Sequence, residues 1–245
     1  MRAYPATFYQ DLDRTARPSA RVVVPLLMRW IRPRAVVDVG CGDGSWLAEF
    51  AAAGAEHVHG LDGDWVREDQ LKIPRASFQR CALDQSISVA RRFDLAVSLE
   101  VAEHLPQARA AGLVRDLAQL APVVLFSAAI PEQGGLNHVN EQWPDWWAEL
   151  FAREGLQAVD ALRWRLWNEA DVTWWYKQNM LLYATPAALE QNPELAAARA
   201  SSPTGVARLV HPHKYAEALR SGRPSLRRWL KMAPAALRDS FGGGR

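Results

Sequence analysis

The sequence predicts an α/β fold, with a seven-stranded, mostly parallel sheet, helices on both faces and an antiparallel last strand. Short apolar runs that end at glycine or at a polar residue alternate with longer segments of helical character. This alternation indicates parallel strands joined by right-handed helical crossovers. The last two apolar runs, residues 156–167 and 173–185, are separated by only a short polar stretch. Strands joined so closely must run antiparallel.

The first four expected strands are short apolar runs that a glycine turn or an acid ends. The strands are expected at residues 35–39, 57–62, 77–84, 93–100, 122–129, 156–167 and 173–185. The expected helices have start and stop signals. Ser19 can cap the first, in which Pro25 predicts a kink, and Gly54 and Gly155 can end two later ones. The helices are expected at residues 19–30, 45–53, 107–120 and 145–153, with short helical pieces after Pro186.

This pattern divides the chain into three regions. We expect an N-terminal helix and lid at residues 1–34, the sheet domain at 35–185, and a basic helical extension at 186–245. From residue 201 onward, nine Lys and Arg residues stand against two acids. Such a segment suits phosphates or an anionic surface, and a solvated basic helix explains it equally.

The composition excludes several classes of protein. The formal net charge is only +2, so nucleic acid is not the expected partner. We find no apolar run of the roughly 18 residues that span a bilayer, no secretory signal, and only two cysteines. We therefore expect a cytoplasmic protein with free thiols and no membrane span. The eleven tryptophans indicate an aromatic core and an interface, which leaves a homodimer open.

A glycine-rich turn follows the first expected strand. Residues 36–47 read V-V-D-V-G-C-G-D-G-S-W-L, with glycine at 40, 42 and 44. Ligands of open α/β sheets bind at this edge, and glycine lets a ligand approach the backbone. The dinucleotide pattern G-x-G-x-x-G would need a glycine at Ser45, so this turn indicates a different ligand.

The run D-V-G-C-G-D-G after a buried strand resembles motif I of class I S-adenosylmethionine-dependent methyltransferases. The resemblance covers about residues 35–185 and implies a Rossmann-like fold with that cofactor. It implies that the three glycines surround the aminoacyl end near Asp38, that Asp62 accepts both ribose hydroxyls and that Asp84 bonds the adenine amino group. Helix capping and turn formation remain the alternatives for the acids. The full implied set is Asp38, Gly40, Cys41, Gly42, Gly44, Asp62, Gly63, Leu83, Asp84, Ser98 and Leu99.

A second motif, E-x-x-E-H, follows the fourth expected strand at Glu100, Glu103 and His104. Its E-H pair is similar to that of the ubiquinone-pathway O-methyltransferases. The full pattern also resembles the small-RNA 3′-terminal 2′-O-methyltransferases, in which two acids, this His and a later His bind a divalent ion. His138, in the polar loop after the fifth strand, matches the later His.

Three explanations of these residues stay open. In the first, Glu100, Glu103, His104 and His138 bind Mg²⁺ or Mn²⁺, and the ion lowers the pKa of a hydroxyl that is to be methylated. Imidazole ligands favour Mn²⁺ or Zn²⁺ over Mg²⁺. In the second, His138 or His104 acts without metal as the catalytic base. In the third, His104 and Glu103 only stabilise the loop.

The acceptor is expected to be polar. The loop at residues 130–142 is dense in amides and acids, and tryptophans follow it. Amides beside an aromatic wall suit a sugar or another polar ring. The candidate acceptor contacts are Tyr9, Asn137, Asn140, Glu141 and Trp143. We therefore expect O-methylation of a sugar, a glycan precursor or a glycosylated small molecule. The rivals are an RNA-terminal 2′-O-methyltransferase, a metal-free small-molecule N-methyltransferase and an inactive cofactor-binding module.

Overall fold

A computed structural model describes the backbone of residues 6–222 and the side chains of residues 14–220. The predicted acceptor contact of Tyr9 and most of the basic C-terminal segment therefore lie outside the described side chains. The chain forms two units, residues 1–209 and 210–245, and the helix α9 (Pro212–Gly222) belongs to the second. No helix in the described stretch has the length and apolar content that crossing a membrane requires.

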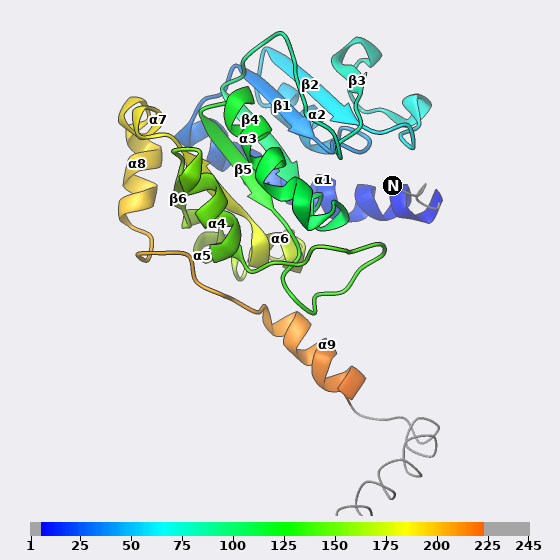
Figure 1. The fold of residues 1–245 in the computed structure, drawn as a ribbon, viewed down its shortest axis with the longest axis vertical. Coiled ribbons are helices and arrows are strands. Elements are labelled where there is room, and N and C mark those ends of the chain that lie inside the picture. Colours follow the sequence, from blue (N-terminus) through cyan, green and yellow to red (C-terminus); the bar gives the residue numbers. More distant parts are fainter. Residues whose placement is uncertain (1–5, 223–245) are drawn as a thin grey trace, which may run out of the picture. The chain divides into compact units, whose positions relative to one another are not determined.

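The first unit contains a seven-stranded sheet in the order β3-β2-β1-β4-β5-β7-β6 (Figure 1). Its strands are β1 (Ala35–Val39), β2 (His57–Asp62), β3 (Phe78–Arg80), β4 (Leu95–Leu99), β5 (Val123–Ser127), β6 (Gln157–Val159) and β7 (Leu181–Ala184). The first five strands are parallel, and β7 runs antiparallel to both β5 and β6. The predicted α/β class, with its antiparallel last strand, is confirmed.

Helices bury both faces of this sheet. They are α1 (Ala6–Trp30), α2 (Ser45–Ala52), α3 (Ala110–Leu120), α4 (Pro144–Arg153), α5 (Ala161–Leu166), α6 (Trp174–Asn179), α7 (Pro186–Gln191) and α8 (Pro193–Ala200). One core cluster joins the sheet to α1, α2 and α5–α8, and the other joins it to α3 and α4. The helices directly after Pro186 thus belong to the first unit, which ends at Leu209.

The first helix is longer than the sequence predicts. It begins at Ala6 and includes both Pro18 and Pro25. The sequence predicts a start at Ser19, which can cap a helix, and proline removes a hydrogen bond from a helix interior. The buried side chains of Val23, Val24 and Leu27 pack this helix into the core and offset that cost.

Three predicted strands are much shorter than expected. The third ends at Arg80, so Leu83 and Asp84 lie in a turn beyond it. The run 156–167 holds only β6 before α5 begins, and the run 173–185 holds α6 before β7. Leu162 and Leu166 are both buried at a spacing of four residues, which is a helical pattern. The final strand pair is antiparallel as predicted, but two helices connect it.

Candidate functional site

The glycine turn begins where β1 ends, at the carboxyl edge of the sheet. Gly40 has φ of 87°, and a Cβ there would lie 2.3 Å from Cγ2 of Val101. Only glycine fits such a position without strain. The backbone N–H groups of Gly40 and Cys41 donate to the carbonyl of Leu61, at 2.7 and 3.3 Å. These bonds fix the turn against the end of β2.

Asp62 ends β2 and faces this turn. Its carboxylate accepts the backbone N–H of Gly42 and of Gly63, each at 2.7 Å, and it also hydrogen-bonds to Trp65. Burial raises the pKa of Asp62 to about 6, although these donors favour its charged form. A carboxylate held in this way can accept hydrogen bonds from the two hydroxyls of a ribose.

Asp38 is buried beside Asp62. Its pKa is raised well above the ordinary value by burial first, and then by the charges of Asp62 and Asp43. Asp43 pairs with Lys72 at 3.0 Å and accepts the backbone N–H of Ser45 at 2.9 Å. A buried acid whose pKa neighbouring carboxylates raise favours a positively charged ligand. The turn thus fits a ligand with a cationic amino-acid end and a ribose.

Two other predicted cofactor residues lie in a turn after β3. Asp84 is exposed there, and the carbonyl of Leu83 accepts Nε of Arg109 at 3.0 Å. Arg109 also pairs with Asp116 at 2.5 Å, and Asp116 accepts the backbone N–H of Ile87 at 3.0 Å. Sequence reasoning missed this Arg–Asp clamp, because no local pattern links the helix to the turn.

The last two predicted cofactor residues lie in β4. The buried hydroxyl of Ser98 donates to the carbonyl of Val39 at 2.9 Å, which ties β4 to β1, and Leu99 is buried. Both sit where the central strands end.

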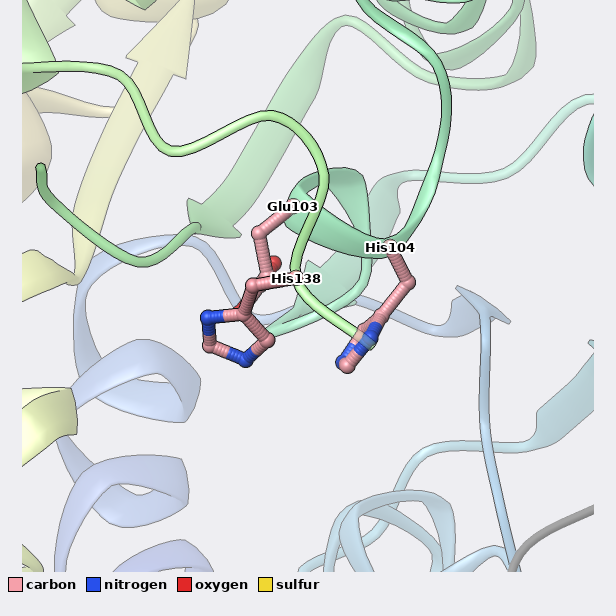
Figure 2. A group of neighbouring side chains, drawn as sticks. All are labelled: Glu103, His104 and His138. Atoms are coloured by element: carbon pink, nitrogen blue, oxygen red, sulfur yellow. The ribbon is translucent and has the colours of Figure 1, made fainter. Parts of the chain in front are cut away.

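A group of possible metal ligands follows β4 and β5. Ligand atoms of Glu103, His104 and His138 all lie within 4.8 Å of one another. Figure 2 shows the three side chains converging from the short turn after β4 and from the loop after β5. The rings of His104 and His138 meet edge to face with centroids 4.9 Å apart. Glu100, which the sequence predicts as a fourth ligand, lies outside this group.

Glu103 is buried at 0% exposure, and neither carboxylate oxygen makes a well-formed hydrogen bond. Burial and the charge of Glu100 raise its pKa well above the ordinary range, while the backbone N–H groups of Glu103 and Ala129 favour its charged form less strongly. The pKa of His104 is lowered to about 4 by burial and by His138. His104 is therefore neutral at pH 7, the form in which imidazole binds a metal ion.

The loop at residues 130–142 is shaped to present His138. Nδ1 of His138 lies 2.8 Å from Oε1 of Glu141, which also accepts the backbone N–H of Gly134 at 2.8 Å. A Cβ on Gly135 would lie 2.2 Å from Nε2 of His138, so glycine makes room for the ring. The carbonyl of Glu103 accepts the backbone N–H groups of residues 139 and 140 at 2.8 and 3.1 Å. These contacts bring the His138 loop onto the turn that carries Glu103.

Apart from Tyr9, the predicted acceptor contacts lie in this loop or directly after it, and they differ in how exposed they are. Asn137 is exposed and has φ of 62°, and Asn140 is buried. The carboxamide oxygen of Asn140 accepts Nε2 of Gln142 at 3.1 Å. Trp143 is half-buried and directly precedes α4.

Glu100 lies within a buried carboxamide cluster that sequence reasoning missed. Its carboxylate accepts Nδ2 of Asn179 at 3.2 Å and Nε2 of Gln133 at 3.3 Å. Gln178 donates to both amides, at 3.0 Å each. The sequence contains one indication of this cluster, the polar run K-Q-N within an apolar stretch. A strand prediction for residues 173–185 gives that run no role.

A family model described as a methyltransferase domain matches residues 13–171 of this chain. A sugar N-methyltransferase, KedS8 from Streptoalloteichus, has a similar structure with a TM-score of 0.57, 14% identity, and coverage of 76% of this chain and 96% of that one. A magnesium protoporphyrin IX methyltransferase from Synechocystis, solved with bound SAH, gives a TM-score of 0.51, 19% identity, and coverage of 76% and 90%. A putative O-methyltransferase from Nostoc punctiforme has a TM-score of 0.53 and 12% identity. The match covers 73% of this chain and 59% of that one. No curated protein matches the chain.

Proposed function

Because the chain belongs to the methyltransferase domain family and is an S-adenosylmethionine-dependent methyltransferase, we propose that it methylates a hydroxyl of a sugar-like acceptor with the help of a divalent ion. The acceptor would be a sugar, a glycan precursor or a glycosylated small molecule. The observation that carries this proposal is the buried Glu103 carboxylate, which lacks a well-formed hydrogen bond beside two histidines. A buried charge in that state is expensive unless a cation joins it.

The cofactor would be held by the residues around the glycine turn. Its ammonium would face Asp38, its ribose hydroxyls would bind Asp62, and its adenine would lie near the turn at Leu83 and Asp84. When bound, the cofactor supplies a methyl group on a positively charged sulfur. The protein's part is to hold the acceptor oxygen in line and to help it lose its proton.

Glu103, His104 and His138 would hold the metal ion. One carboxylate and two imidazoles suit Mn²⁺ better than Mg²⁺, which prefers oxygen ligands. An ion with open positions lowers the pKa of a hydroxyl that binds it. Glu141 would orient His138 through the 2.8 Å contact to Nδ1 and leave Nε2 for the ion.

The polar groups of the loop that carries His138 favour a sugar-like acceptor. Asn137, Asn140 and Glu141 would offer amide and carboxylate groups to hydroxyls. The half-buried ring of Trp143, over which Arg208 lies at 5.6 Å from the centroid, would offer an apolar surface to a sugar ring. A ring that bears neighbouring hydroxyls would match both the ion and this loop.

We expect Mn²⁺ alone to bind the wild-type protein in isothermal titration calorimetry. Glu103→Gln and His138→Gln should abolish this binding, because each removes one of three ligands. Glu132→Gln removes a charge from an exposed residue of the same loop, so it should bind Mn²⁺ like the wild type. A chelator should then stop methyl transfer to sugars that carry neighbouring hydroxyls.

Two results would contradict the proposal in different ways. If Mn²⁺ does not bind and a chelator does not affect methyl transfer, the role of a metal ion is refuted. His138 or His104 would then remain as the base. Transfer to amino sugars but to no hydroxyl would refute O-methylation itself.

A further inference from the structure

Glu100 occupies a costly position and lies outside the group of Glu103, His104 and His138, although the charge of His138 favours its ionised form less strongly than burial opposes it. It follows β4 directly, and its φ of 56° is left-handed, a conformation that non-glycine residues rarely adopt. In the part of the chain that the structure describes, no lysine or arginine forms an ion pair with it. Burial raises the pKa of its carboxyl, so the charge is held at a cost.

Neutral donors hold this carboxylate in one orientation. Nδ2 of Asn179 lies 3.2 and 3.4 Å from its two oxygens, and Nε2 of Gln133 lies 3.3 Å from one of them. Asn179 and Gln133 also bond to each other at 3.0 Å, and Gln178 bonds to both. The cluster joins the ends of three strands, since Gln133 follows β5 and Asn179 precedes β7. It fixes the direction of Glu100 but supplies no positive charge.

The sheet places Glu100 opposite Asp38. The strand order reverses between β1 and β4, and ligands of such sheets bind in the crevice at that point. Asp38 lies in β1 on one side of the crevice, and Glu100 follows β4 on the other. Both carboxylates act on the buried Tyr176. Burial raises the pKa of its hydroxyl, and the charges of Glu100 and Asp38 raise that pKa further.

We propose that Glu100, positioned by Asn179 and Gln133, binds the positively charged sulfur of S-adenosylmethionine and thereby distinguishes the cofactor from its product. S-adenosylhomocysteine carries a neutral thioether at the same atom, while its amino-acid and ribose groups are identical. Asp38 and Asp62 therefore serve both molecules equally, and Glu100 serves only the charged one. This inference rests on the cofactor alone and does not depend on the proposed acceptor or metal.

The experiment compares the two molecules by isothermal titration calorimetry on the full chain, without acceptor and with EDTA present. Glu100→Gln keeps the shape and removes the charge. We expect it to weaken S-adenosylmethionine binding about tenfold, the usual size of one charge-assisted contact, and to change S-adenosylhomocysteine binding less than about twofold. Glu132→Gln is the matched control, because Glu132 is an exposed glutamate with φ of 65° in the neighbouring loop. It should change neither affinity.

Asn179→Leu and Gln133→Leu test the positioning role. Each removes one donor, and each should lower the ratio of the two affinities while S-adenosylhomocysteine still binds. That retained binding shows that the variant is folded. An equal loss for both molecules in Glu100→Gln, or no loss for either, would overturn the proposal. A wild-type protein that binds the two molecules equally would overturn it as well.

Discussion

Single carboxylates determine what the carboxyl edge of this sheet can bind. Asp62 is held by backbone N–H groups and Glu100 by carboxamides, and the buried Asp38 lies close enough to Asp62 for their charges to interact. The neighbouring Asp43, by contrast, forms an ion pair with Lys72. A ligand that brings a positive charge and hydroxyls relieves this arrangement, and S-adenosylmethionine has both.

The affinity for S-adenosylhomocysteine should fall in mild acid. The pKa of Asp62 is about 6, and only the charged carboxylate can accept both ribose hydroxyls. Between pH 7 and pH 5 the charged fraction falls about tenfold, so the dissociation constant should rise by about that factor. Calorimetry at several pH values checks this, with Asp62→Asn as a variant that lacks this group's titration.

The titration of Asp62 would not unfold the protein in this pH range, so unfolding does not explain a loss of affinity. Its pKa is higher in the folded protein than in the unfolded chain, so protonation of Asp62 stabilises the fold as the pH falls from about 6 toward 4. An affinity that stays constant from pH 7 to pH 5 would contradict the role given to Asp62.

At the scale of elements, a buried ion pair supports α6. Arg163 of α5 pairs with Asp160, and their side chains are 0% and 2% exposed. Nη1 of Arg163 also donates to the carbonyl of Gln178 at 3.3 Å. The ion pair is thus linked to Glu100 through Gln178 of α6, whose side chain bonds to the two carboxamides that hold Glu100.

Asp160→Asn should destabilise the protein by about 3–5 kcal/mol, because it leaves a buried guanidinium without a compensating charge. Urea denaturation measures this. Glu56→Gln breaks the exposed pair between Arg34 and Glu56 and should have little effect. Equal stability of the two variants would show that Arg163 does not depend on Asp160.

The sequence predicts the elements on the cofactor side better than those on the acceptor side. The first two strands and the glycine turn are local patterns, so their bounds are nearly right. The sequence predicts strands where α5 and α6 lie, because aromatic residues favour strands when burial is unknown. Gln133 and Asn179 meet Glu100 only through the sheet topology, which no local pattern contains.

At the scale of the whole molecule, the residues predicted for the site all belong to the first unit. All seven strands, both core clusters and each predicted cofactor and metal residue lie before residue 209. A chain that ends at Leu209 should therefore melt at the same temperature and bind S-adenosylhomocysteine as the full chain does. Thermal denaturation and calorimetry check this. Aggregation or loss of binding would show that residues 210–245 are required for the fold.

The position of β7 between β5 and β6 also sets an order of events on the ribosome. The strands β3, β2, β1, β4 and β5 are all made by residue 127, and they can pair as soon as they emerge. The strand β6 has no neighbour until residues 181–184 appear, and Asn179 emerges just before them. The growing chain can therefore form the half that carries the glycine turn while the half that orients Glu100 is still being translated.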